Sequence, residues 1–96
     1  MFIVSLTYTA PLDVLDSHLP AHVAWLDEGL AQGWLLLAGR KVPRTGGILI
    51  ARGEREEVER LVANDPFVLN GVATTELIEF QPSRVAPDVT LGSLLG

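Results

Sequence analysis

The stretch from Trp34 to Arg52, WLLLAGRKVPRTGGILIAR, decides the fold of this chain. Its two ends are rich in apolar and β-branched residues, which predicts one strand over residues 34–42 and a second over residues 48–52. Between them, residues 43–47 hold a proline, a threonine and two glycines, the composition of a turn. The stretch is therefore expected to form a hairpin, and the rest of the chain has to be arranged around it.

A helix is expected on each side of this hairpin. Within residues 13–32, five residues recur at three- and four-residue steps, which is the period of one helix face. Gly33 ends this pattern. The residues on that face are Leu19, His22, Val23, Leu26 and Leu30. Pro20 disturbs the pattern, so that either a short helical turn precedes it or the main helix begins there. Residues 54–64 form the second helix, because an apolar stripe follows acidic residues in its first turns.

Strands over residues 2–8 and 71–81 complete the order β-α-β-β-α-β, which is the ferredoxin-like motif. The fold class is therefore α+β, a sandwich with an antiparallel four-stranded sheet. Both helices pack on one sheet face because each crossover is right-handed. The first three strands are apolar on both faces, so the second face should be covered by dimerisation. A homodimer or a higher homo-oligomer is expected.

The length of 96 residues predicts one domain, and the 48% hydrophobic content predicts a packed core. We place the domain at residues 1–82. Residues 83–96 show no periodicity, and we interpret them as a C-terminal tail or a dimer arm because Leu91, Leu94 and Leu95 are apolar.

The composition excludes several classes of function. A net charge of −5 without a basic run argues against a nucleic-acid partner. The chain has no cysteine, which excludes disulfides, zinc-thiolate sites and thiol nucleophiles. No signal peptide and no apolar run of about 18 residues is present, so we expect a cytoplasmic protein that does not enter a membrane. His18 and His22 have the spacing of metal ligands, but Pro20 lies between them and no third ligand is evident, so no metal is expected.

Chain direction predicts where the chemistry lies. The start of the first helix and the end of the second should meet at one edge of the domain, which brings His22 and Asp65 together. A carboxylate beside an imidazole fixes its tautomer and supports its protonated form, and histidine exchanges protons near neutral pH. His22 and Asp65 are therefore the candidate catalytic pair.

Other residues at this edge are candidates for substrate binding. Arg40 and Lys41 would contact a substrate anion, with Arg44 close by. The end of the first strand, Tyr8, reaches the same edge. Trp25 and Phe67 complete the expected substrate-binding set, and Trp25 with Trp34 could form an aromatic pocket. A small anionic molecule is the expected ligand.

Structural interpretations stand beside these. His22 could be a core histidine bonded to a backbone carbonyl, and both tryptophans could be core residues. Asp65 could be only a helix N-cap, since Asp-Pro-Phe is a common helix start. The cations near residue 41 could be a solvated hairpin tip.

Four segments resemble the YCII-related family, and together they span the chain to about Gln81. They are the opening strand Phe2 to Tyr8, the segment Pro20-Ala21-His22-Val23-Ala24-Trp25-Leu26, the segment Gly33-Trp34-Leu35-Leu36-Leu37-Ala38-Gly39, and Asn64-Asp65-Pro66-Phe67 followed by Gly71-Val72. The family usually has a proline after the Ala-Gly of the third segment, where this chain has Arg40.

The resemblance implies a dimeric ferredoxin-like fold, related to the dimeric α+β barrel proteins, with His22 and Asp65 in the active site. Some relatives look like dehydrochlorinases or lactone-handling enzymes of aromatic degradation. It therefore implies a cofactor-free enzyme acting on a small organic acid or lactone. The alternatives are a non-catalytic small-molecule-binding module and a dimeric accessory domain.

Overall fold

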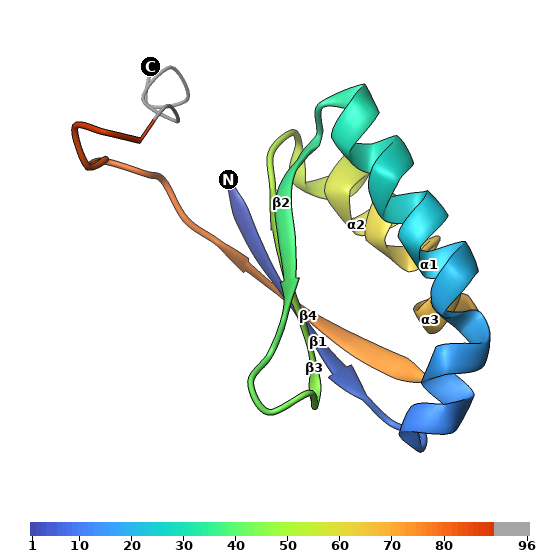
Figure 1. Cartoon of the computed structure of the whole chain (residues 1–96). Coiled ribbons are helices and arrows are strands. Elements are labelled where there is room, and N and C mark those ends of the chain that lie inside the picture. Colours follow the sequence, from blue (N-terminus) through green and yellow to red (C-terminus); the bar gives the residue numbers. More distant parts are fainter. Residues whose placement is uncertain (90–96) are drawn as a thin grey trace.

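The computed structural model describes residues 1–89 and shows one antiparallel sheet with helices on one face (Figure 1). The sheet order is β2-β3-β1-β4, which confirms the expected ferredoxin-like α+β fold. The elements in chain order are β1 (Phe2–Tyr8), α1 (Leu12–Gln32), β2 (Leu35–Arg40), β3 (Gly46–Ala51), α2 (Arg55–Ala63), α3 (Pro66–Leu69) and β4 (Ala73–Glu79).

The core lies between the sheet and the helices and is organised by β1, a central strand. Its alternate residues Phe2, Val4 and Leu6 are buried on the helix-facing side. Leu15 of α1 and Val58 of α2 pack in the same cluster. Burying a side chain of this kind contributes roughly 1.5–3 kcal/mol, so this alternation is what fixes the register of β1 in the sheet.

The first helix is continuous, and Pro20 lies inside it. The expectation that the proline would start or divide the helix is therefore wrong. Pro20 is on the exposed side, where water can bond the carbonyl group that loses its helical partner. The helix ends at Gly33, which has a φ of 86° and whose N–H donates to the carbonyls of Gly29 and Leu30.

The hairpin differs from the prediction at its turn. Strand β3 begins at Gly46, so Gly46 and Gly47 belong to the strand, and β2 ends before Lys41. The reason is the close approach of β1, because a Cβ atom at Gly46 would collide with the carbonyl oxygen of Leu6. These glycines allow two backbones to approach, and the turn is made by residues 41–45.

The opposite sheet face has an apolar part, and Ser5, Thr7, Thr74 and Glu76 make the rest of it polar. Its half-buried apolar residues are Ile3, Ile48 and Ile50, and the more exposed Leu37 and Ile78 lie on the same face. Leu37 is 47% exposed and Ile78 is 46% exposed, and they stand on the two edge strands.

Beyond β4, residues 80–89 have no helix or regular strand and run away from the sheet (Figure 1). The leucines of the expected arm, Leu91, Leu94 and Leu95, lie outside the described residues. Within residues 1–89, no helix combines the length and the apolar character needed to cross a membrane.

Candidate functional site

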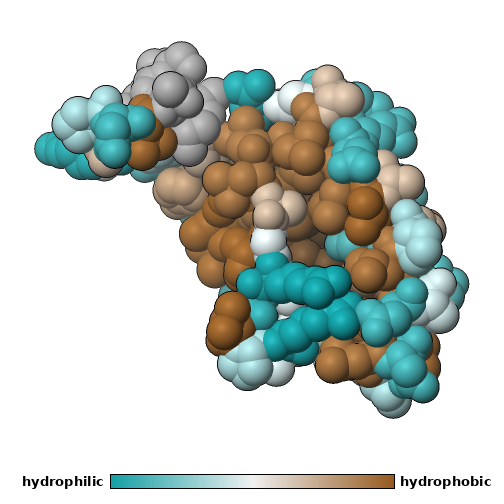
Figure 2. All heavy atoms as spheres, in the orientation of Figure 1, coloured by the Kyte–Doolittle hydropathy of each residue, from teal (hydrophilic) through white to brown (hydrophobic). Residues whose placement is uncertain are grey.

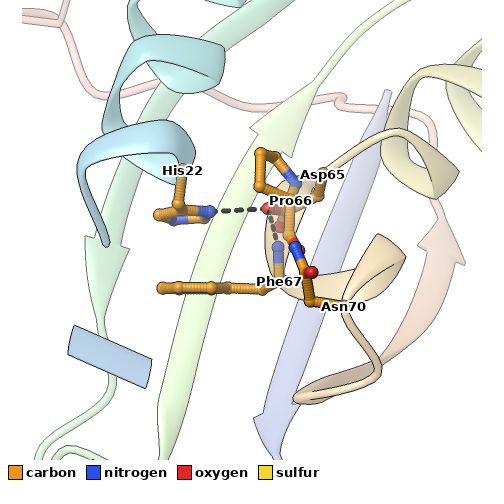
Figure 3. A network of polar contacts seen from close by, with 5 residues as sticks. All are labelled: His22, Asp65, Pro66, Phe67 and Asn70. Carbon is orange, nitrogen blue, oxygen red and sulfur yellow. Dashed lines mark hydrogen bonds and ion pairs between the residues drawn. The ribbon is translucent and has the colours of Figure 1, made fainter. Parts of the chain in front are cut away.

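His22 and Asp65 are in contact, as predicted, although His22 lies in the middle of α1 and not near its start (Figure 3). His22 projects from α1 and Asp65 lies between α2 and α3, 43 residues later in the chain. Nδ1 of His22 is 2.7 Å from Oδ1 of Asp65. The carboxylate is 0% exposed and the imidazole is nearly buried, so this polar contact is largely shielded from water.

Asp65 is also the N-cap of α3. Its Oδ1 accepts a hydrogen bond of 3.0 Å from the backbone N–H of Phe67, and Pro66 occupies the first helical position. The side-chain amide of Asn70 donates to the Pro66 carbonyl and closes the turn. Asp65 is therefore both the N-cap of α3 and the partner of His22, and the interpretation that it is only an N-cap is wrong.

This hydrogen-bond arrangement defines the tautomer of the imidazole. An ionised carboxylate only accepts, so Nδ1 of His22 carries a proton and donates it to Asp65. Nε2 then holds the lone pair of the neutral ring. Among residues 1–89 no group bonds Nε2, which leaves it able to take a proton from a ligand.

Aromatic rings hold the imidazole in place. Phe67 stacks on it with centroids 3.9 Å apart and planes inclined by 10°. The Trp25 ring lies beside the imidazole, with 6.0 Å between the ring centroids and 31° between the ring planes. The Tyr8 ring packs against Phe67 in turn, with 5.8 Å between the ring centroids and 81° between the ring planes. The pair is therefore positioned by packing as well as by hydrogen bonds.

A pocket of about 140 Å³ opens beside His22, between α1 and the helix-facing side of the sheet. Tyr8, Phe67 and Arg40 line it with His22, and the small residues Ala38 and Gly47 lie at its sheet side. Figure 2 shows apolar surface around a hollow on this face, with hydrophilic side chains along its lower rim.

The three expected cations have different places. Arg40 lines the pocket. Lys41 instead lies with its Nζ 3.4 Å from Oγ1 of Thr7, whose side chain is on the outer sheet face. Arg44 donates from Nη2 to Oδ1 of Asp16 at 2.7 Å. The structure thus brings Arg40 to the pocket and does not bring Lys41 there.

The expected aromatic residues are also divided. Tyr8 and Phe67 line the pocket, whereas Trp25 lines a neighbouring hollow with Trp34, and their rings are 5.5 Å apart. Trp25 therefore supports His22 from outside the pocket. Among the residues that the structure describes, no group of three His, Cys, Asp or Glu side chains could hold a metal ion.

Two features of the site escaped the sequence interpretation. Leu19, Val23 and Leu26 line the pocket, although their helical period was assigned to a packed face. The pairing of Arg44 with Asp16 has no sequence signal, because the two residues are 28 positions apart. The hydrogen bond from Arg44 to Asp16 raises the pKa of Arg44, burial opposes this, and the nearby Tyr8 hydroxyl adds to the increase.

Comparisons with known proteins agree with the fold. The chain is similar to the solved structure of 5-chloro-2-hydroxyhydroquinone dehydrochlorinase (TftG) from Burkholderia phenoliruptrix AC1100 in complex with 2,5-dihydroxybenzoquinone, with a TM-score of 0.70 and 24% sequence identity. The match covers 86% of this chain and 96% of that chain. A search of curated proteins gives no match. The model of the YCII-related domain matches residues 1–81, and the chain therefore belongs to the YCII-related domain family.

Proposed function

We propose that this protein is a cofactor-free enzyme in which His22 moves a proton on a small cyclic organic acid or lactone. The observation that carries the proposal is the 2.7 Å contact between Nδ1 of His22 and Oδ1 of Asp65, beside a pocket that His22 lines. Nε2 acts as the general base and then as the general acid. Asp65 holds the tautomer and stabilises the imidazolium formed after proton transfer.

The pocket supports a small ligand. A cavity of about 150 Å³ takes one benzene molecule, and the pocket of about 140 Å³ is of that size. Its apolar walls suit a ring, and Arg40 suits an acidic oxygen on that ring. The structurally similar dehydrochlorinase was solved with 2,5-dihydroxybenzoquinone, a single ring with acidic hydroxyl groups, which agrees with this ligand class.

We further propose that the protein works as a dimer. The apolar part of the outer face would leave Leu37 and Ile78 in water in a monomer, and a second copy packed face to face would bury them. Residues 80–89, which run away from the sheet, would extend onto the partner. This assembly leaves the helix-facing pocket in each subunit.

The experiment is a screen for product formation. Protein treated with chelator and freed of small molecules is incubated with single-ring hydroxyquinones, chlorinated hydroxyquinones, cyclic acids and lactones. Product is followed by chromatography, and chloride release is measured for the chlorinated compounds. We expect turnover of at least one compound without added cofactor. Thermal stabilisation by a compound that is never converted would instead favour a binding module.

A further inference from the structure

We propose that Tyr8 and Arg44 form an oxyanion-binding subsite at the end of the pocket next to the hairpin turn. In this subsite the Tyr8 hydroxyl contacts the substrate, and Arg44 is a positioning residue that acts through Tyr8. The inference rests on the proposed function and deepens it, because it assigns a place to the substrate oxygen on which negative charge develops.

Tyr8 is held in a fixed relation to His22 by one shared ring. It is the last residue of β1, and its side chain lies on the helix-facing side with Leu6. The planes of the Phe67 and Tyr8 rings are inclined by 81°, and the Phe67 ring stacks on the imidazole of His22. The phenol and the imidazole therefore both pack against Phe67 and both line the same pocket, where they can act on one small molecule.

Arg44 is fixed beside Tyr8 by the hairpin turn and by α1. Its Cζ lies 5.8 Å from the centre of the Tyr8 ring, and its Nη2 is bonded to Asp16 at 2.7 Å. The side chain of Arg44 is 22% exposed and that of Asp16 is 52% exposed, so this ion pair contributes little to stability. The pair holds the guanidinium beside Tyr8, which lines the pocket, whereas Arg44 itself does not line it.

The chemistry of the donors gives Tyr8 its role. A guanidinium has only donors, so toward Arg44 the Tyr8 oxygen can act only as an acceptor. The O–H of Tyr8 is then left to donate to an oxygen of the ligand. Nε of Arg44 is buried and has no hydrogen-bond partner among residues 1–89, which adds an unused donor at the same place.

The ligand class that fits is a ring with an enolisable carbonyl group. When Nε2 of His22 takes a proton from the carbon next to the carbonyl, the C–H bond breaks and an N–H bond forms. The electron pair becomes the C=C bond of an enolate, and the negative charge moves to the oxygen. Donors aimed at that oxygen stabilise the transition state more than the ground state.

The test uses 2,5-dihydroxybenzoquinone as the probe, since its ionised form is already an enolate on a single ring. Binding is measured by titration of its absorbance with the full chain. We expect Tyr8→Phe and Arg44→Gln each to raise Kd by about tenfold or more, the typical effect of losing a hydrogen bond to a charged group. Because the two residues act as a unit, the double variant should bind about as weakly as the weaker single variant.

The controls separate charge, position and folding. Arg60→Gln removes a cation of an exposed ion pair on α2 that does not line the pocket, and it should leave Kd within about twofold. Arg44→Lys keeps the charge without the planar fork and should not restore binding. Thermal unfolding of Tyr8→Phe and Arg44→Gln should stay close to that of the unchanged protein, which excludes a folding defect.

The inference is overturned if the unchanged protein does not bind the probe, or if Tyr8→Phe and Arg44→Gln bind it as the unchanged protein does. It is also overturned if Arg60→Gln weakens binding as much as Arg44→Gln. The proposed function fails in a different way, through a His22 variant that keeps full turnover while the Tyr8 and Arg44 variants still lose probe affinity.

Discussion

The imidazole of His22 and the phenyl ring of Phe67 lie nearly parallel, with 3.9 Å between their centroids (Figure 3). Both residues are also bonded to the same atom, Oδ1 of Asp65, which accepts from Nδ1 of His22 and from the backbone N–H of Phe67. The start of α3 and the histidine pair are thus one structural unit. A change in Asp65 acts on local folding and on the imidazole together, and the choice of substitution can separate the two effects.

Asp65→Asn should separate charge from structure. The amide oxygen can still accept from Nδ1 and from the N–H of Phe67, so the free energy of unfolding should fall by only about 1 kcal/mol. The neutral amide stabilises the imidazolium less than a carboxylate, and turnover should fall by at least about tenfold. Chemical denaturation and turnover of the substrate found in the screen measure both.

Asp65→Ala is the matched comparison. It removes the N-cap and leaves a buried donor on His22 without a partner, so we expect a loss of about 3 kcal/mol. Equal destabilisation by the asparagine and alanine variants would contradict the double role of Oδ1.

Gly46→Ala should be severely destabilising. The new methyl group would meet the backbone oxygen of Leu6 in the neighbouring strand, so β1 and β3 would have to separate. We expect a loss of about 3 kcal/mol or more, or a failure to fold. Gly39→Ala is the control on the paired strand, since its Cβ has no atom within 4 Å and its unfolding midpoint should barely change.

Ile78→Lys should convert the proposed dimer to a monomer. It places a charge on the outer sheet face, where a second copy would have to bury it. Light scattering coupled to size-exclusion chromatography gives the mass directly. Leu69→Lys is the control, because Leu69 is exposed on α3, on the helix side of the sheet. A monomeric unchanged protein, or a dimer that survives Ile78→Lys, would contradict face-to-face dimerisation.

The sequence predicted the fold well where the pattern was local. The alternation of apolar residues in β1 and the apolar periodicity of α1 and α2 indicate which faces are buried. The order of the elements then leaves few possible topologies. The contact between His22 and Asp65 followed from chain direction alone. The short helix α3 was anticipated only as a helical turn after the Asp65 N-cap.

The errors concern features that depend on tertiary contacts. Gly46 has turn chemistry, but the approach of β1 places it in a strand. Pro20 favours a helix break, but the rest of the helix packs on the sheet and overrides that preference. Lys41 follows Arg40 directly, and adjacent residues at the end of a strand point to opposite faces, so only one of them reaches the pocket.

The most direct test of the account is the turnover of His22→Asn. The asparagine Nδ2 can replace Nδ1 as the donor to Asp65, but the variant has no Nε2 to exchange a proton. We predict that its unfolding midpoint stays near that of the unchanged protein while turnover falls by about a hundredfold or more. A folded His22→Asn protein that turns over substrate within about twofold of the unchanged protein would contradict the proposed role of His22.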